Sequence, residues 1–543
     1  MTVRQMGGGL STVVDVLRAA ADANGQVEAY VEPAEPGSAG VVAAGADGRR
    51  RLTFAQWDAA ADGVARLLAG EGVSAGEVVC LLLPSSIDYA VCYQAAARLG
   101  AVTTGVNLRL GPAEQASITT RVCPAVTVVD TDLVAPDAVP PGAGRLVARA
   151  ALWPAATAPA PRLPRLRAED PVAVVWTSGS TEVPKGAVFD HANLAAVAAG
   201  TDVLCRPGDR RLSPLPFAHV GHMTRPWGEI VHGVTTVITP QPWTAAAAIA
   251  LLDGERVTVG QGVPTQWALV LAHPDLAHAD LSHLRIAGTG AARVPPELVR
   301  AMRERLGCPV VVRYTSTESS LGTGTEPGDP DDVVATTVGR PVPGVELDLV
   351  DEDGGTVGVG RVGRVRLRSG AVMRGYAGDR RTGPLLDSVA TAAVLDDAGW
   401  ITTGDLGWRG DDGNLRLVGR ATEMYIRGGY NVYPAEVEGV LGAHPAIAEV
   451  AVVGLPDPVL GEVGVAAVVP VPGVAPPGLE ELRSLCTSRL ADYKAPDRLA
   501  VVDRLPLTAM GKVDKRALAD ELARGQPTTT DTTATETKAK VAS

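Results

Sequence analysis

The sequence predicts an α/β protein with more than one domain, and three observations lead to this prediction. The chain has 543 residues, which is too long for one ordinary hydrophobic core. Its 46% hydrophobic and 20% charged residues are typical of a soluble globular protein. An apolar run at residues 78–83, a helical pattern at 87–98 and a short strand at 100–102 alternate as they do in layered α/β architectures.

Charge and cysteine usage narrow the class of protein further. The net charge of −12 argues against a nucleic-acid-binding surface. No apolar run reaches the length of a membrane span, and the N-terminus lacks a basic region followed by an apolar stretch. The six cysteines lie far apart without a CxxC pair, which favours reduced thiols over disulfides or a zinc site. We therefore expect a cytoplasmic protein.

The N-terminal part contains one clear helix signal. An amphipathic stretch at 10–21 precedes a Gly/Ala/Pro-rich loop that extends to about residue 50. Thr53 and Gln56 then have capping-box spacing, and apolar residues follow at helical intervals. Residues 135–166 are rich in Pro, Ala and Arg without periodicity, so we expect a connecting loop there.

A loop suited to binding phosphate follows the strand predicted at 171–176. Thr177, Ser178, Gly179, Ser180 and Thr181 can direct backbone N–H groups and hydroxyls toward a polyanion, and Lys185 adds positive charge. The pattern is close to the P-loop of nucleoside triphosphatases, but Pro184 replaces its second glycine and Gly186 replaces its magnesium-binding Ser/Thr. A plain surface turn is the alternative for any Ser/Gly-rich loop.

Further motifs carry groups that a nucleotide and its metal require. The proline-rich stretch 214–222 indicates a fixed irregular wall containing His219, and the small residues at 288–292 permit close backbone approach. A buried strand that begins at residue 310 leads into the aromatic Tyr314 and the polar run that ends at Glu318, whose carboxylate is a hard oxygen ligand of the kind that magnesium prefers. By itself the Thr-Gly-Asp that ends at Asp405 would be a turn, but its carboxylate can accept hydrogen bonds from two neighbouring hydroxyls.

Together these motifs resemble those of the adenylate-forming superfamily, which comprises acyl-CoA synthetases, luciferases and the adenylation domains of peptide synthetases. They occur in the order of that superfamily from Leu52 to Arg516, where the pattern Pro-x-Thr-x-x-Gly-Lys-x-x-x-Arg places the family's catalytic lysine on Lys512. The resemblance implies a large multi-sheet N-terminal α/β domain at 1–419 and a small mobile α+β C-terminal domain at 420–524. Residues 525–543 have almost nothing to bury, so we expect a disordered tail.

The resemblance also implies a role for each site residue. Catalysis is assigned to Lys512, Thr317, Glu318 and His219, with Glu318 as the magnesium ligand. ATP and AMP binding is assigned to Thr177, Ser178, Gly179, Ser180, Thr181, Lys185, Gly290, Ala291, Tyr314, Asp405 and Arg420. The acyl pocket is assigned to His219, Met223, Val263, Gly288 and Gly290, and the CoA channel to Gly428, Gly429 and Tyr430.

The implied function is that of an AMP-forming acyl-CoA ligase. A fatty or aromatic acid would react with ATP and Mg²⁺ to give acyl-AMP and pyrophosphate, and CoA would then take the acyl group and release AMP. Stretch 214–224 contains no acid to hold an α-ammonium, so a simple carboxylic acid is favoured over an amino acid. Trp267 suggests an apolar pocket, whereas His222 and Arg225 are candidates to bind a second carboxylate.

Two alternatives stay open from the sequence. The acyl group can pass to the phosphopantetheine of a carrier protein instead of to CoA. Glu182 stands where family loops have glycine, and a carboxylate beside a triphosphate repels it, so a catalytically weak nucleotide-binding homologue is the second alternative. Thr315 and Thr422 also depart from the family pattern, after the adenine-stacking aromatic residue and at the hinge respectively.

Overall fold

The computed structural model describes residues 9–33, 47–177, 184–292, 294–428, 430–508 and 512–525. It divides into two units, one comprising 1–403 with 408–416 and the other 404–407 with 417–543. Asp405, which the expected boundary at 419 assigned to the N-terminal domain, therefore belongs to the second unit. Among the described residues, no helix combines the length and apolar character needed to cross a membrane. The expected tail beyond residue 525 and the loop residues Ser178–Thr181 lie outside the described residues.

The first unit contains a nine-stranded sheet whose centre is parallel. Six strands, in the order β13-β12-β11-β9-β10-β1, pair in parallel, and antiparallel strands flank them on both sides. In sheet order the strands are β15 Arg340–Pro341, β14 Ser320–Gly324, β13 Val310–Ser316, β12 Ile286–Gly290, β11 Val259–Gln261, β9 Arg210–Ser213, β10 Thr235–Ile238, β1 Glu28–Pro33 and β2 Arg49–Thr53.

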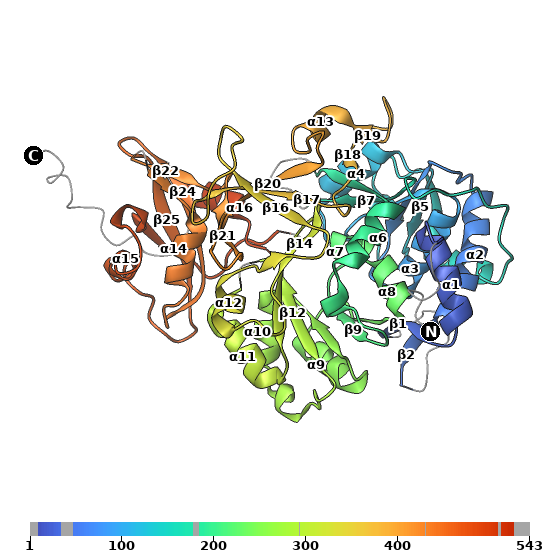
Figure 1. Ribbon diagram of the computed structural model, residues 1–543, viewed down its shortest axis with the longest axis horizontal. Coiled ribbons are helices and arrows are strands. Elements are labelled where there is room, and N and C mark those ends of the chain that lie inside the picture. The colour runs from blue at the N-terminus through green and yellow to red at the C-terminus, as the bar shows by residue number, and fades with distance from the viewer. Residues whose placement is uncertain are drawn as a thin grey trace, which may run out of the picture. The chain divides into compact units, whose positions relative to one another are not determined.

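An eight-stranded sheet forms the other main layer of this unit (Figure 1). Its strands β7, β4, β3, β5 and β6 are parallel, and β8, β18 and β19 extend it in antiparallel pairing. In sheet order they are β19 Leu386–Asp387, β18 Gly375–Ala377, β8 Gly186–Asp190, β7 Pro171–Trp176, β4 Val102–Gly105, β3 Val78–Leu82, β5 Val126–Val129 and β6 Arg145–Ala148.

Helices separate and cover the two sheets. Alternate residues of one strand enter different cores: in β3, Val79 and Leu81 join the largest core, while Cys80 and Leu82 join a second core on the opposite face. The largest core also holds Tyr30 of β1, so both sheets share it. Its helices are α1 Val13–Asn24, α2 Phe54–Gly70, α3 Ile87–Arg98, α5 Leu152–Ala155, α6 His191–Ala199 and α8 Pro226–His232.

The outer faces have helices of their own. A further core on the outer face of the nine-stranded sheet packs Val31 of β1 against helices that follow in the chain. These are α9 Ala245–Gly254, α10 Pro264–Ala272, α11 Pro296–Leu306 and α12 Asp331–Thr336. Helix α4 Pro112–Val122 contributes Ile118 and Val122 to the outer core of the eight-stranded sheet. The predicted α/β class is confirmed by this layering.

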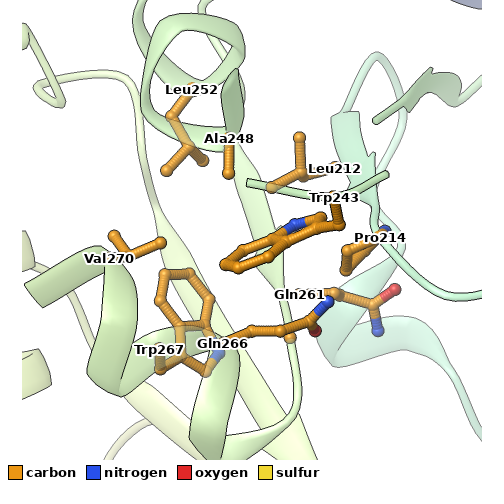
Figure 2. A pocket seen from close by; sticks show the side chains of 10 residues that line it. Leu212, Pro214, Trp243, Ala248, Leu252, Gln261, Gln266, Trp267 and Val270 are labelled. Atoms are coloured by element: carbon orange, nitrogen blue, oxygen red, sulfur yellow. The ribbon is translucent and has the colours of Figure 1, made fainter. Parts of the chain in front are cut away.

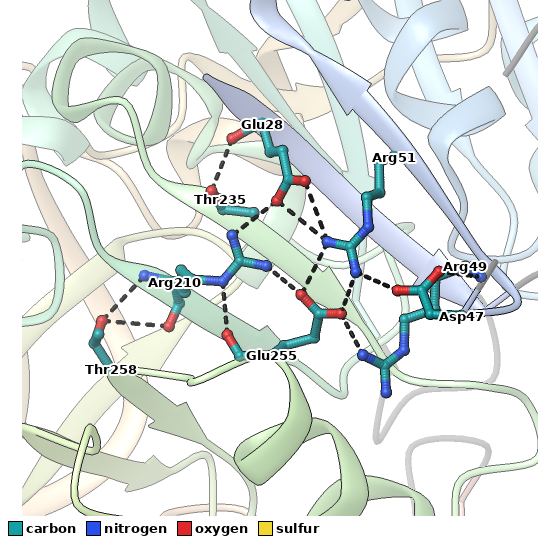
Figure 3. A network of polar contacts seen from close by, with 8 residues as sticks. All are labelled: Glu28, Asp47, Arg49, Arg51, Arg210, Thr235, Glu255 and Thr258. Carbon is teal, nitrogen blue, oxygen red and sulfur yellow. Dashed lines mark hydrogen bonds and ion pairs between the residues drawn. The ribbon is translucent and has the colours of Figure 1, made fainter. Parts of the chain in front are cut away.

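A network of ion pairs joins the β1–β2 hairpin to the strands beside it (Figure 3). The Glu255 carboxylate, at the end of α9, accepts hydrogen bonds from Arg49, Arg51 and Arg210. Arg210 of β9 also donates to Glu28 of β1 over 2.8 Å. Three guanidinium groups thus surround one nearly buried carboxylate, and these ion pairs add to the apolar packing of β1 and β2.

The remaining elements are a four-stranded sheet, two short helices of the first unit and the elements of the second unit. A four-stranded sheet comprises β16 Glu346–Val350, β17 Gly363–Arg368, β20 Trp400–Arg409 and β21 Leu415–Arg420, and short helices α7 Val220–Met223 and α13 Ser388–Ala392 lie elsewhere in the first unit. The second unit has a five-stranded sheet with helices α14 Pro434–Leu441, α15 Leu479–Thr487 and α16 Lys515–Ala523. Its strands are β22 Tyr425–Arg427, β23 Tyr430–Val432, β24 Ile447–Asp457, β25 Gly461–Pro470 and β26 Arg498–Val501.

Several sequence predictions are met and two are corrected. The capping box of Thr53 and Gln56 is present, and the strand at 171–176 and the helix at 87–98 have the predicted bounds. The expected loop at 135–166 is wrong in part, because it contains β6 and α5. Strand β6 lies at the sheet edge, where Val147 alone is buried, so no alternating pattern marks it. The hairpin strands β1 and β2 were likewise not predicted.

Candidate active site

Four predicted site segments meet at one edge of the nine-stranded sheet. Strands β9, β11, β12 and β13 are parallel neighbours, so the loops at their carboxyl ends emerge at the same edge. His219 follows β9, Val263 follows β11, and Ala291 and Thr317 follow β12 and β13. In α/β sheets this edge is where ligands bind. The topology itself therefore gathers the residues of these four loops, whereas Thr177 and Lys185 lie between β7 and β8 of the eight-stranded sheet.

The last residue of β12, Gly290, has no space for a side chain. A Cβ atom added to Gly290 would lie 2.2 Å from the carbonyl oxygen of Arg313 in the neighbouring strand. Ala291, the next residue, has a positive φ of 62°. A Cβ at Gly288 would lie 3.3 Å from the Leu204 side chain and 3.8 Å from the carbonyl oxygen of Gly260. Of the two glycines assigned to the acyl pocket, Gly290 is thus required by the packing of β12 against β13.

The ends of the phosphate loop are held together by the antiparallel pair β7–β8. The backbone N–H of Thr177 donates to the carbonyl of Lys185 over 2.9 Å, and its hydroxyl accepts from the Lys185 N–H over 3.2 Å. Lys185 is exposed and Thr177 is half-buried. The intervening Ser178, Gly179, Ser180, Thr181 and Glu182 lie outside the described residues, so their predicted phosphate contacts stay predictions.

Tyr376 connects the phosphate-loop lysine to the predicted metal ligand. The ammonium of Lys185 lies 5.3 Å from the centre of the Tyr376 ring, within the range of a cation–π contact. The Tyr376 hydroxyl donates to the Glu318 carboxylate over 2.9 Å. Burial raises the pKa of Tyr376, and the charge of Glu318 raises it further, so the hydroxyl remains a donor. A cation, a phenol and a carboxylate are thus linked by two direct contacts.

Tyr314 lies in β13, and Thr317 and Glu318 lie in the turn that joins β13 to β14. Tyr314 is 7% exposed, and its hydroxyl lies 3.5 Å from the Thr403 hydroxyl. Thr317 and Glu318 are half-buried, and the backbone carbonyl of Glu318 accepts from the Met373 N–H. Because the turn is fixed from both sides, the Glu318 carboxylate has a defined position.

In the segment from His219 to Arg225, His219 is half-buried, whereas His222 and Met223 are buried. The Nε2 of half-buried His219 lies 3.0 Å from the side-chain nitrogen of Asn107. His222 instead stacks on Phe217 with ring centres 3.4 Å apart, and burial followed by the charges of Arg211 and Arg225 lowers its pKa well below the usual value. Met223 is fully buried, with its sulfur contacting the Tyr89 hydroxyl. Met223 is therefore part of the largest core, and its assignment to the acyl pocket stays a prediction.

A small apolar cavity borders the predicted acyl pocket (Figure 2). The indoles of Trp243 and Trp267 face each other across it, and Gln261 and Gln266 lie at its polar side. Trp267 donates its indole N–H to the carbonyl of Gly288 over 3.1 Å. The cavity is lined by Leu212, Pro214, Trp243, Ala248, Leu252, Gln261, Gly262, Gln266, Trp267 and Val270. An aromatic wall therefore stands directly behind Gly288.

The remaining predicted site residues belong to the second unit. Asp405 and Arg420 form an ion pair of 3.2 Å across β20 and β21. The backbone carbonyl of Lys512 accepts from the Thr508 N–H, and the Lys512 N–H donates to the Thr508 hydroxyl. Gly428 has a φ of 56°, and exposed Tyr430 stacks on Tyr493 at 4.5 Å.

Thr422, at the predicted hinge, is followed by a residue that forms an ion pair. Beside Thr422, Glu423 accepts a hydrogen bond from Lys515 over 2.9 Å, and Lys515 also contacts Glu438 over 2.8 Å. Gly429, assigned to the CoA channel, lies outside the described residues.

Sequence reasoning missed Tyr376 and Asn107. Asn107 and His219 are 112 positions apart, so no local pattern connects them. Tyr376 follows Gly375, where an added Cβ would lie 2.6 Å from the Thr391 hydroxyl oxygen. A glycine beside an aromatic residue was the only available signal, and it is a weak one.

A model of the AMP-binding enzyme family matches residues 18–377, and a model of the AMP-binding enzyme C-terminal domain matches residues 436–512. The chain belongs to the AMP-binding enzyme family. It is thus a member of the adenylate-forming superfamily that its motifs resemble, in the acyl-CoA synthetase branch.

Three similar proteins illustrate this placement. The chain is 35% identical to an indoleacetate–CoA ligase of Aromatoleum aromaticum, over 88% of this chain and 94% of that protein. It is 31% identical to a long-chain-fatty-acid–CoA ligase of Mycobacterium tuberculosis, over 94% of this chain and 99% of that protein. The ATP-bound structure of MatB from Rhodopseudomonas palustris is similar with a TM-score of 0.81 and 26% identity, over 93% and 98% of the two chains.

Proposed function

We propose that this protein is an AMP-forming acyl-CoA ligase. The observation that carries the proposal is the connection of Lys185 to Glu318 through Tyr376, at the sheet edge where the acyl residues also gather. This arrangement combines a cation suited to phosphate with a carboxylate suited to magnesium. The names of its relatives, which are CoA ligases, support the same reaction class.

The proposed reaction has two halves. In the first, the carboxylate of the acid attacks the α-phosphorus of ATP, forming an acyl–phosphate bond and releasing pyrophosphate. In the second, the thiol of CoA attacks the acyl carbonyl, loses its proton and displaces AMP. The chain's own task in the first half is to stabilise the negative charge that develops on phosphate oxygens. Lys185, Lys512 and Thr317 are the groups that we assign to that task.

Magnesium is the metal that this site would hold. The described residues contain no group of three or more His, Cys, Asp or Glu side chains arranged around a metal position. That absence of a dedicated protein cage suits magnesium, which is commonly bound by one or two carboxylates together with substrate phosphates. Glu318 would be its protein ligand, with Tyr376 orienting the carboxylate. When bound, the ion would neutralise charge on the phosphates.

We assign nucleotide binding to both units. Tyr314 would lie against the adenine and Asp405 would accept the ribose hydroxyls, with Arg420 holding the Asp405 carboxylate in place. The domain boundary would lie at Gly419 and Arg420 with the hinge at Thr422, and the segment from 420 to 524 would act as a mobile lid that carries Lys512. Gly428, Gly429 and Tyr430 would border the path of the thiol.

The acid is proposed to carry an apolar body, aromatic or aliphatic. Two tryptophans stand behind Gly288, and the relatives named above act on indoleacetate and on long-chain fatty acids. His219, with Asn107 beside it, is the polar pair that we assign to the reacting carboxylate.

A coupled assay tests the function. Purified protein is incubated with ATP, Mg²⁺ and single acids from an aromatic and fatty panel, with and without CoA, and pyrophosphate and acyl-CoA are measured. We expect pyrophosphate release that depends on the acid, and acyl-CoA whenever CoA is present. Acyl-AMP that is consumed only by a carrier protein bearing phosphopantetheine would favour the carrier-protein alternative. ATP binding without turnover of any acid would contradict the ligase proposal and favour a regulatory nucleotide-binding protein.

A further inference from the structure

Arg225 lies between two segments that were assigned to the predicted acyl pocket, the one that begins at His219 and the one that follows Gln261. It follows α7, the turn that begins after His219, and precedes α8. Its guanidinium Nη1 lies 3.4 Å from the side-chain oxygen of Gln261, the last residue of β11. Gln261 in turn is paired in the sheet with Gly288 of β12. The guanidinium therefore lies where the His219 segment meets the sheet edge that carries Gly288.

The charge of Arg225 has no acidic partner within the described part of the chain. No Asp or Glu carboxylate among the described residues lies within ion-pair distance of the Arg225 guanidinium. The 3.4 Å contact between Arg225 and Gln261 is long for a hydrogen bond. The neighbouring Arg211 is paired with Glu229, and Arg313 donates to the carbonyl of Thr325. Burial, followed by the positive charges of Arg211 and Arg313, lowers the pKa of Arg225 to about 9.

Such a cation is costly to keep without a partner. A half-buried charge that is not paired lowers stability unless something supplies the missing hydrogen bonds. If Arg225 had a purely structural role, we would expect an acidic residue beside it. Arg211, for comparison, is paired with Glu229. His222, three residues earlier, is stacked on Phe217 and is not available to share the task. Among the described residues the one hydrogen-bond partner of Arg225 is Gln261, so its other N–H groups are available to a ligand beside the segments assigned to the acyl pocket.

We propose that the acid bound by this protein carries, besides its reacting carboxylate, a second oxygen acceptor that Arg225 binds. The inference rests on the proposed ligase function and specifies the substrate class of the same site. A carboxylate is the stronger partner because it neutralises the charge and accepts two hydrogen bonds from one guanidinium. A keto oxygen accepts a hydrogen bond but leaves the charge uncompensated. The expected order of preference is dicarboxylic acid, keto acid, unsubstituted acid.

The substrate preference of the unmodified enzyme provides the first test. Pyrophosphate release is measured for three series of equal chain length, from four to nine carbons: α,ω-dicarboxylic acids, (ω−1)-oxo acids and plain monocarboxylic acids. At the best length, we expect kcat/KM for a dicarboxylic or oxo acid to exceed that of the matched monocarboxylic acid at least tenfold. Comparison of the dicarboxylic acids with the oxo acids shows whether the second oxygen-bearing group of the preferred substrate is charged. Equal or better turnover of the plain acids at every length would overturn the inference.

Substitution of Arg225 provides the second test. Arg225→Met should lower the preference for the oxygenated acid at least tenfold, mainly through KM for the acid, while KM for ATP stays within about twofold. Arg225→Lys, which keeps the charge, should retain part of the preference. Arg300→Met, on the exposed face of α11, is the matched control and should change neither value.

The two proposals fail in distinguishable ways. If Arg225→Met lowers kcat/KM equally for all three series, Arg225 supports the fold and the inference is wrong. If plain acids are activated and oxygenated ones are not, the inference is wrong while the ligase function stands. If no acid of any kind, including aromatic acids, gives turnover, both are wrong. Poor folding of Arg225→Met leaves the comparison of the three series in the unmodified enzyme as the deciding result.

Discussion

The hydroxyl of Tyr376 donates to the carboxylate of Glu318 over 2.9 Å. The two residues come from different sheets, since Tyr376 is in β18 of the eight-stranded sheet and Glu318 follows β13 of the nine-stranded sheet. The contact therefore sets the position of a proposed metal ligand relative to Lys185, which lies over the same tyrosine ring.

Removal of that hydroxyl is expected to weaken the use of Mg²⁺ with ATP. Tyr376→Phe keeps the ring beneath Lys185 but leaves the Glu318 carboxylate without its donor. A hydrogen bond to a charged group contributes about 1.5–3 kcal/mol, so kcat/KM for MgATP should fall roughly ten- to hundredfold. Pyrophosphate release over a Mg²⁺ titration measures this, with thermal unfolding as the control for folding. An unchanged Mg²⁺ dependence would show that Tyr376 does not orient the carboxylate.

Two glycines of β12 are expected to differ sharply in their tolerance of a methyl group. Gly290→Ala places a Cβ 2.2 Å from the Arg313 carbonyl oxygen, so the backbones of β12 and β13 must separate. Gly288→Ala comes closest to a leucine side chain, at 3.3 Å, which can adjust. We expect Gly290→Ala to lower the free energy of unfolding by ~1–3 kcal/mol and to reduce turnover, and Gly288→Ala to cost less in stability. Urea unfolding of both variants gives the comparison, and equal losses would contradict it.

Lys512 is expected to serve only the first half-reaction. Lys512→Ala should slow acyl-AMP formation by ~10²-fold or more, the scale expected when one preorganised donor to developing charge is lost. Thioester formation from supplied acyl-AMP and CoA should change little. Lys494→Ala is a matched control, because that lysine of the same unit is engaged with Glu436 over 2.6 Å. Equal slowing of both halves by Lys512→Ala would argue against alternating use of the second unit.

His191 is expected to make the fold sensitive to mild acid. It is buried at the start of α6, where its Nδ1 accepts a hydrogen bond from the Val13 N–H over 3.2 Å. Burial lowers its pKa from 6.5 to about 4, against the opposing charges of Asp170 and Asp15. Between these two values the unfolded chain binds more protons than the folded one. Stability that is present at pH 7 is therefore lost as the pH falls from about 6.5 to about 4.

The size of this effect follows from the pKa difference. A shift from 6.5 to about 4 corresponds to about 3 kcal/mol over that pH window. His191→Gln keeps an acceptor for the Val13 N–H but does not titrate. Its free energy of unfolding should consequently fall less than that of the unmodified protein between pH 7 and pH 4. Parallel urea titrations at several pH values measure the difference, and parallel curves for the two proteins would show that His191 is not responsible.

Local patterns in the sequence predicted the buried elements well. The capping box at Thr53, the continuous apolar strand at 171–176 and the helix at 87–98 depend on neighbouring residues alone, so their spacing is visible in one dimension. Strands at an edge are different. Strand β6 buries only Val147, and β1 and β2 are held in part by Glu255 and Arg210 from distant segments. Such stabilisation leaves no local pattern.

The sequence by itself determined the family and the inventory of chemical groups. Lys185, Tyr314, Glu318 and Lys512 occur in motifs whose order is specific, and the family match agrees with them. Only the tertiary structure decided which groups meet. The parallel order of β9, β11, β12 and β13 gathers their loops at one edge, and Tyr376 joins Lys185 to Glu318. His222 is buried against Phe217, while Arg225 has no acid beside it among the residues that the structure describes, because burial and pairing depend on residues far away along the chain.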